Sequence, residues 1–419
     1  MAEPRGQRVD SPRGALERAE PRGRPQRPQP APVARVLRPA DFAPTKPAPR
    51  IGSVDALRGF TIACIIGLDG AALSLRDMSR EAGPVLGRVG QILGSQFEHA
   101  EWDGFRFYDL IFPLLIFVTG IAVVLSLPRI IEREGRLHAH LRVLRRTLLL
   151  FGLGFLFYGG FSVPFSEIRM SGVLQRIALC YLAASLLFMH LRLRGLVVAF
   201  GAILLGYWAA MTFVPVPGVG AGSLVPGANL SDWIDARYLP GRLFLGDRDP
   251  EGLLSTLPAV ATCLIGVFAG LLLVDPRIEP QRKSLWLIGA GLAAAAGGFL
   301  WGLEFPIIKS LWTSSFVLVS GGCSLLLLGV LYHLIDVRQQ RAWPEIFVWV
   351  GANAITLYLL NGIAGFERLA TRFMGGDIAG FLDRTIAPST GRFVSHALGV
   401  VLAVLLARFL YRRKIFLRV

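Results

Sequence analysis

The chain has 419 residues, of which 53% are hydrophobic, and its mean hydropathy is +0.53. A soluble globular protein of that composition would expose apolar surface to water, so the composition excludes that class and indicates a polytopic membrane protein. The net charge of +15 lies in short basic clusters between apolar segments and in the first fifty residues. This pattern argues against nucleic-acid binding and for cytoplasmic segments that face anionic lipid.

Residues 1–50 are rich in Arg, Pro and Ala and contain no apolar run long enough for a signal peptide. We expect them to form a disordered, basic cytoplasmic tail, followed by one transmembrane domain over residues 51–419.

Ten apolar segments follow the tail, most of them near the length of about 20 residues that spans a bilayer. Gly and Ala inside these segments allow close helix contact, so the sequence predicts an all-α bundle of about ten spans rather than a barrel. The expected spans are 56–75, 110–127, 147–161, 173–190, 196–214, 253–274, 285–303, 316–334, 346–363 and 393–410.

Arginine placement predicts the orientation of these spans. Basic residues cluster in the second, fourth, sixth and eighth connections and at the end of the chain. The positive-inside rule puts them in the cytoplasm, so both termini would be cytoplasmic in a multi-pass protein of the cell (inner) membrane. The acidic first and fifth connections would then face outward.

The polar stretch 98–109, EHAEWDGFRFYD, precedes the second apolar segment and holds the first candidate for catalysis. His99 lies beside Glu98, Glu101 and Trp102, and Asp109 belongs to the same stretch. A carboxylate partner would fix the tautomer of the imidazole and keep it basic near neutral pH. An exposed loop histidine without a role explains the same pattern, so the residues alone leave both interpretations open.

Other polar side chains near or inside the spans are candidates for binding or orienting a substrate. Asp69 lies deep in the first apolar segment, where a carboxylate is costly. Asp249 and Glu251 flank Pro250 before the sixth span, where they could hold an amino or hydroxyl group or cap a helix.

Asn353, within the ninth span, could contact a ligand or join helices. Further polar groups at the outer halves of spans are Gln175, Arg176, Lys309 and Trp312.

Several classes of site have no support in the sequence. There is no P-loop, no G-x-G-x-x-G, no G-x-S-x-G and no metal-ligand spacing, which argues against nucleotide hydrolysis, dinucleotide redox chemistry and metallo-hydrolysis. Each of the four cysteines lies inside an apolar segment, as expected of small buried hydrophobes.

The stretches SVDALRGF, EHAEWDG with DLIFPLLIFVTG, SGVLQRIALCY, DPEGLL, LWTSSF and GANAITLY occur in this order between Ile51 and about Ile363. This ordered set resembles the heparan-α-glucosaminide N-acetyltransferase family and its bacterial relatives. The resemblance implies an integral-membrane acyltransferase that passes acetyl groups from cytosolic acetyl-CoA to an amino sugar or glycan on the far side of the membrane. By the match of H-A-x-W-x-G, the family's catalytic histidine corresponds to His99.

Two features depart from the family. The family's polar residue in the first span is usually Asn and corresponds to Asp69 here, so a role that needs a neutral amide donor is not carried over. The lysosomal member has a large outward N-terminal region that has no counterpart here, so heparan sulfate is not the expected acceptor.

Acyl transfer from a thioester needs a group that takes a proton from the attacking nucleophile. His99 would be that general base in a ternary complex, or it would carry the acetyl group briefly; we favour the base because it needs no covalent intermediate. The phosphates of acetyl-CoA would need cations on the cytoplasmic side, and Arg58, Arg145 and Arg146 are available there. No metal is expected, and a homodimer is left open.

Two other functions fit the residues. One is O-acetylation of a cell-envelope polysaccharide. The other is a transporter or permease whose polar residues line a path through the bilayer.

Overall fold

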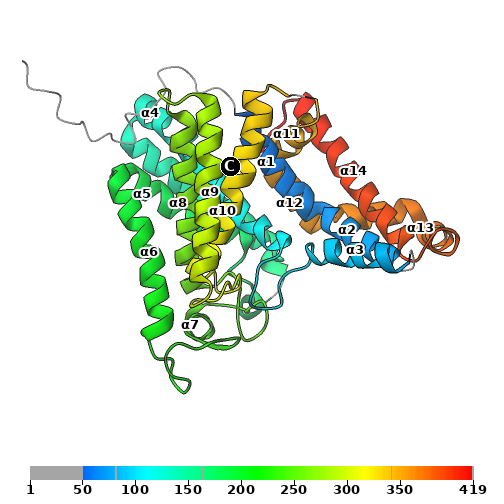
Figure 1. Cartoon of the computed structure of the whole chain (residues 1–419), viewed down its shortest axis with the longest axis horizontal. Coiled ribbons are helices and arrows are strands. Elements are labelled where there is room, and N and C mark those ends of the chain that lie inside the picture. The colour runs from blue at the N-terminus through cyan, green and yellow to red at the C-terminus, as the bar shows by residue number, and fades with distance from the viewer. Residues whose placement is uncertain (1–50, 81–82, 163, 341, 418–419) are drawn as a thin grey trace, which may run out of the picture. The chain divides into compact units, whose positions relative to one another are not determined.

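A computed structural model describes residues 51–80, 83–162, 164–340 and 342–417. The described part is almost entirely helical (Figure 1), with one short hairpin of antiparallel strands, β1 (Leu224–Val225) and β2 (Ala228–Asn229). The expected all-α polytopic fold is confirmed. The expected basic tail, 1–50, lies outside the described residues.

The helices are joined by connections of different lengths, the longest of which lies between α6 and α7 and contains the hairpin. Their bounds are α1 (Gly52–Ala63), α2 (Asp69–Ser79), α3 (Pro84–Ser95), α4 (Ile111–Phe157), α5 (Val173–His190), α6 (Leu193–Phe213), α7 (Leu230–Tyr238), α8 (Leu253–Val274), α9 (Pro280–Trp301), α10 (Ser314–Tyr332), α11 (Glu345–Ala352), α12 (Ala354–Ile363), α13 (Phe366–Thr385) and α14 (Thr390–Arg412). A 3₁₀ turn, Phe107–Leu110, leads into α4.

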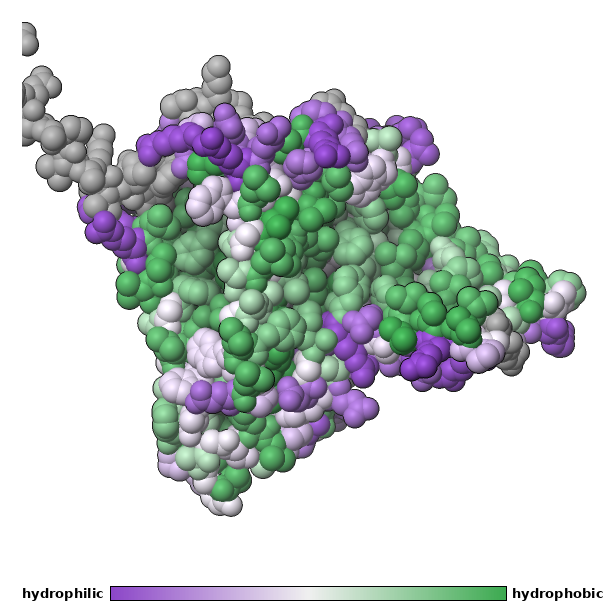
Figure 2. Space-filling view, viewed as in Figure 1, coloured by the Kyte–Doolittle hydropathy of each residue, from purple (hydrophilic) through white to green (hydrophobic). Residues whose placement is uncertain are grey.

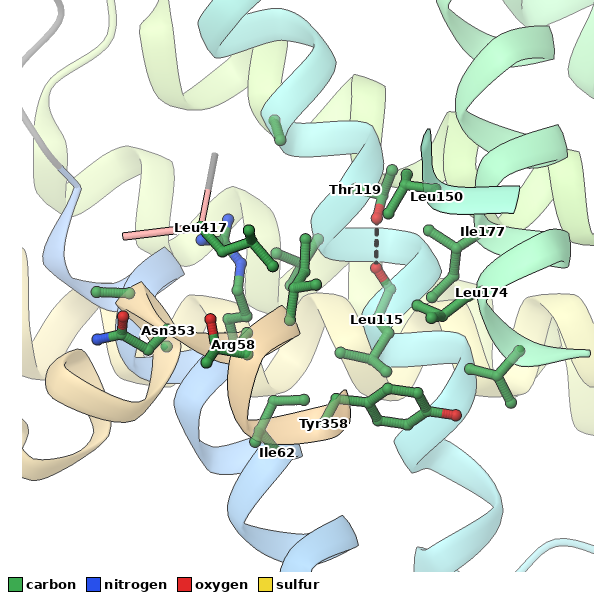
Figure 3. A pocket seen from close by; sticks show the side chains of 18 of the residues that line it. Arg58, Ile62, Leu115, Thr119, Leu150, Leu174, Ile177, Asn353, Tyr358 and Leu417 are labelled. Atoms are coloured by element: carbon green, nitrogen blue, oxygen red, sulfur yellow. Dashed lines mark hydrogen bonds between the residues drawn. The ribbon is translucent and has the colours of Figure 1, made fainter. Parts of the chain in front are cut away.

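Eight helices in the described part are long and apolar enough to cross a membrane. One of them contains two of the expected spans, because α4 runs on through 128–146, where the sequence predicted a connection. Gly135 breaks this helix with φ +85° and ψ 170°, a conformation that glycine adopts readily because it has no Cβ. Thr119 and Leu150, one from each arm, line the same cavity, so the arms lie alongside each other (Figure 3).

The expected ninth span, 346–363, is also not one straight helix. α11 and α12 meet at Asn353 with a bend of 73°. α11 lies tightly against α1, where a Cβ at Gly59 would fall 1.8 Å from the Phe347 carbonyl oxygen and one at Gly351 2.0 Å from that of Asp55. The bent pair counts as a ninth span, and the division of α4 at Gly135 separates a tenth, so all ten expected segments have a counterpart.

The first expected span is bent as well. A π-helical turn, Cys64–Leu68, separates α1 from α2, and Asp69 is the first residue of α2. The next helix, α3, was not expected from the sequence. It lies against α2 through Gly90 and Gly94, which leave room for Ser79 and Arg76. α2 and α3 together lead the chain to the polar stretch that carries His99.

α8 lies at the centre of the bundle. Within its most apolar stretch 78% of the residues are buried, against 22% in α6, α9 and α14. Gly120 of α4 allows the close contact, since a Cβ there would lie 1.9 Å from the Cys263 carbonyl oxygen. Figure 2 shows apolar residues over the outer sides of the helices and hydrophilic residues gathered near helix ends, as expected of a surface that faces lipid.

Candidate active site

His99 and Asp109 form a hydrogen-bonded pair at the start of α4. The Asp109 carboxylate is fully buried, and its Oδ1 lies 2.8 Å from His99 Nδ1. Its Oδ2 accepts hydrogen bonds from the backbone N–H groups of Ala100 (3.1 Å) and Arg106 (3.0 Å). A carboxylate can only accept, so Nδ1 carries the proton and Nε2 is left with its lone pair. The His99 side chain is 52% exposed, so that lone pair can reach a ligand.

Lys309 completes this group from the connection between α9 and α10. Its Nζ lies 2.8 Å from His99 Nδ1, 3.2 Å from Nε2 and 3.3 Å from Asp109 Oδ1. Burial lowers the pKa of the Lys309 ammonium, and the negative charges of Asp109 and Glu251 oppose the shift. The neutral amine is therefore easier to form here than at a solvated lysine.

Tyr108 connects Asp69 to the same group. The Tyr108 hydroxyl donates a 2.7 Å hydrogen bond to Asp69 Oδ2, and the Tyr108 ring centre lies 4.8 Å from that of His99. Asp69 is placed for this contact because α2 begins there, after the π-helical turn. Tyr108 was not among the predicted site residues, although a tyrosine next to an aspartate at the start of an apolar run could have indicated it.

Glu98 faces two arginines rather than the His99 ring. Its carboxylate pairs with Arg76 Nη1 and lies 3.5 Å from Arg106 Nη1, and Arg106 Nη1 also donates to the His99 carbonyl oxygen (3.1 Å). Glu98 and Arg106 thus fix the backbone that carries His99. Trp102 fixes the same stretch elsewhere, by donating from Nε1 to the Leu224 carbonyl oxygen (3.1 Å).

Asp249 and Glu251 belong to an ion-pair network centred on Arg169. Arg169 donates to both Asp249 oxygens, at 2.9 and 3.2 Å, and to Glu251 Oε2. Asp249 also accepts from the Ser171 hydroxyl (2.6 Å) and from the backbone N–H groups of Phe244 and Glu251. Burial alone would raise the pKa of Asp249, but the hydrogen bonds from Arg169 and Ser171 hold it below its usual range.

These contacts occupy the acceptor positions of Asp249, so the carboxylate is placed to fix the N-terminal end of α8 rather than to hold a substrate. The pairing with Arg169 could not be deduced from the sequence, because 80 residues separate the two.

Gln175 and Arg176 are buried inside the bundle. Arg176 Nη2 donates to the Ser255 hydroxyl and the Gly252 carbonyl oxygen, and its guanidinium lies 5.0 Å from the Trp312 ring centre. Gln175 is buried, and neither its Nε2 nor its Oε1 has a partner among the described residues. Arg176 thus connects α5 to α8, and Trp312 also contacts α8 through a hydrogen bond from its Nε1 to the Thr262 hydroxyl (3.0 Å).

A cavity of about 300 Å³ lies between α1, both arms of α4, α5 and the α11–α12 bend (Figure 3). Arg58 and Arg146 line it, whereas Arg145 is exposed and does not. Asn353 lines it at the bend, with Nδ2 donating to the Trp349 carbonyl oxygen (3.2 Å) and a buried Oδ1 that has no partner among the described residues. Most other lining residues are apolar.

The same helix connects this cavity to the His99 group. Leu115 lines the cavity and follows Asp109 by six residues, about 9 Å at the rise of an α-helix. In the described part of the chain, no three His, Cys, Asp or Glu side chains are arranged to hold a metal ion.

Two curated proteins are similar to this chain. Heparan-alpha-glucosaminide N-acetyltransferase of Homo sapiens is 25% identical over 445 residues, which cover 91% of this chain and 62% of the relative. The protein of the same name from Mus musculus is 26% identical over 387 residues, which cover 77% of this chain and 56% of the relative. No protein-family model matches the chain. The chain thus spans less than two thirds of the length of these relatives, and the resemblance expected from the ordered motifs is confirmed.

Proposed function

We propose that this member of the heparan-alpha-glucosaminide N-acetyltransferase family moves an acetyl group from acetyl-CoA to an amino sugar or glycan, with His99 as the general base. The observation that carries the proposal is the pair of His99 and the buried Asp109, which leaves Nε2 of a half-exposed imidazole available. A histidine held in this way is suited to take a proton from an attacking amine.

The reaction balances without a further reactant. The neutral nitrogen of the acceptor attacks the thioester carbonyl carbon, the new N–C bond forms and the C–S bond breaks. His99 Nε2 takes the proton that the nitrogen loses, and the proton is returned to the leaving thiolate to give free CoA. Asp109 stabilises the imidazolium that exists in between and keeps the ring in its tautomer.

The cavity beside Arg58 and Arg146 supports a donor site. Two cations at an apolar cavity suit a ligand with charged phosphates and a long neutral arm. Arg145 was expected to share this role; it is exposed and does not line the cavity, so we leave it out of the proposed site. Asn353 is placed to contact the arm, because its Oδ1 has no protein partner among the described residues.

The proposed sidedness follows the arginine distribution, with the His99 group facing outward and the Gly135 bend facing the cytoplasm of a cell (inner) membrane protein. A cysteine at the exposed Glu101 should react with an impermeant thiol reagent in whole cells, and one at the exposed Arg136 only after lysis. Of the native cysteines three are buried and Cys323 is partly buried, so the background is low. The reverse labelling pattern would invert the proposed topology.

Purified protein tests the chemistry. With acetyl-CoA and glucosamine, the wild type should release CoA thiol and His99→Ala should not, while both still bind acetyl-CoA in calorimetry. Mass spectrometry of the product separates N-acetylation from O-acetylation. A wild type that neither binds acetyl-CoA nor releases thiol would contradict the proposal and favour a transporter.

A further inference from the structure

The chain has four lysines, and they differ sharply in their surroundings. Lys46 lies outside the described residues. Lys283 is buried with its Nζ donating to the Leu273 carbonyl oxygen (2.7 Å), and Lys414 is exposed. Lys309 is the only described lysine whose Nζ lies within 3.3 Å of both His99 and Asp109.

The Lys309 amine lies beside the proposed base. Its Nζ is 2.8 Å from His99 Nδ1 and 3.2 Å from Nε2, the atom that would take the proton from an attacking nitrogen. This distance is within the reach of a general base.

The backbone that carries Lys309 is held in place. Ile308 N–H donates to the Thr313 hydroxyl (3.0 Å), and the Ile307 carbonyl oxygen accepts from Gly104 N–H (2.9 Å). The amine is therefore presented to the base by a fixed loop on the same side as the His99 stretch.

We propose that Lys309 is itself an acetyl acceptor and becomes Nε-acetylated when no other acceptor fills the site, an inference that rests on the proposed acetyl transfer at His99. The neutral Nζ attacks the thioester carbonyl carbon, the N–C bond forms and the C–S bond breaks. His99 Nε2 takes the proton from Nζ, and the thiolate leaves as CoA after protonation. Burial, which favours the uncharged amine of Lys309, acts in the same direction.

Acetylation of Lys309 would inactivate the site. An acetylated Nζ is an amide that has no basic lone pair and carries no charge, and its added acetyl group would lie against His99. Asp109 would also lose the positive partner that lies 3.3 Å from it.

The acceptor amine and Lys309 would compete for the same acetyl group. A supply of acceptor would therefore protect the enzyme from acetylation of Lys309.

The four lysines provide an internal comparison for the test. The full-length protein is incubated with ¹³C-labelled acetyl-CoA, digested, and the labelled fraction of each lysine is measured by mass spectrometry. Lys309 should be labelled at least about tenfold faster than the exposed Lys414, because it is held beside a base. His99→Ala should reduce labelling of Lys309 to the rate of Lys414, and glucosamine should slow it.

Thiol release with glucosamine, measured on the same preparation, separates this inference from the proposed function. Turnover of glucosamine without excess label on Lys309 would overturn the inference and leave the proposed function intact. Label on Lys309 that depends on His99, without turnover of glucosamine, would support the inference and show that glucosamine is the wrong acceptor. Label that is equal on Lys309 and Lys414, or that survives His99→Ala, would be ordinary chemical acetylation and would overturn the inference.

Discussion

Tyr108 donates a 2.7 Å hydrogen bond to Asp69, and this contact joins the bend between α1 and α2 to the start of α4. It explains how a carboxylate within the first apolar segment takes part in the candidate active site. The contact needs only an acceptor at position 69. The amide oxygen of the family's usual Asn can serve as that acceptor as well as a carboxylate does.

We therefore predict that Asp69→Asn retains nearly full activity. Asp69→Leu and Tyr108→Phe should each lower kcat/KM about 2–10-fold, the effect of one lost hydrogen bond that positions the Tyr108 ring beside His99. Thiol release at saturating acetyl-CoA measures this. An Asp69→Asn variant as impaired as Asp69→Leu would show that the charge of Asp69, rather than its acceptor oxygen, is required.

Asp109→Asn should be far more damaging. The asparagine would fill the same space, but its NH₂ group can donate to Nδ1 and so favour the tautomer that lacks a lone pair on Nε2. Loss of the equivalent carboxylate in a serine protease lowers kcat about 10⁴-fold, and we expect a loss on the order of 10³-fold or more here. Glu98→Gln is the matched control, because Glu98 pairs with Arg76 rather than with the His99 ring. Equal losses in the two variants would contradict the assigned pair.

Replacement of the cavity arginines should weaken donor binding. Arg58→Met and Arg146→Met are each expected to raise the KM for acetyl-CoA about tenfold with little change in kcat, as for the loss of one charge-assisted hydrogen bond. Arg145→Met is the control, since its side chain is exposed outside the cavity. A KM that rises equally in all three variants would indicate a general electrostatic effect instead of a site.

The stability of the protein should fall as pH rises through neutrality because of Asp235. This α7 carboxyl accepts a hydrogen bond from Leu253 N–H, its other oxygen is buried without a partner among the described residues, and burial raises its pKa to about 7. The folded state therefore binds the proton more tightly than the unfolded state. The stabilisation is complete below the ordinary Asp pKa of about 4 and is lost as pH rises through about 7.

Thermal unfolding in detergent should show a melting temperature that decreases from about pH 5 to about pH 8. Asp235→Asn should reduce that decrease, since the amide keeps the acceptor for Leu253 and does not titrate. An unchanged pH dependence in the variant would contradict this assignment.

The fold was predictable where long apolar runs end at clear breaks. The expected spans 173–190 and 253–274 coincide with α5 and α8, because chain-breaking glycines precede both. The bends at Gly135 and Asn353 were not predictable in this way, since they depend on backbone conformation and on the close contact of α11 with α1. α3 was missed because it is too short to span a membrane.

Within the candidate site, the sequence predicted which polar residues lie in one stretch better than it predicted their contact partners. The acids around His99 were expected to orient it as a group, and of these the structure pairs Asp109 with the ring. Glu98 lies next to His99 in sequence yet faces Arg76, and Asp249 pairs with Arg169, because side-chain direction and contacts between distant segments decide these pairs.

Transfer across a sealed membrane tests the central claim most directly. Proteoliposomes with glucosamine trapped inside are given labelled acetyl-CoA outside, and the lumen is analysed for labelled N-acetylglucosamine. Molecules inserted with the cytoplasmic face outward should build up label in the lumen, and His99→Ala proteoliposomes with the same acetyl-CoA binding should build up none. Equal luminal product with His99→Ala, or product only when donor and acceptor are on the same side, would contradict acetyl transfer through this protein by His99.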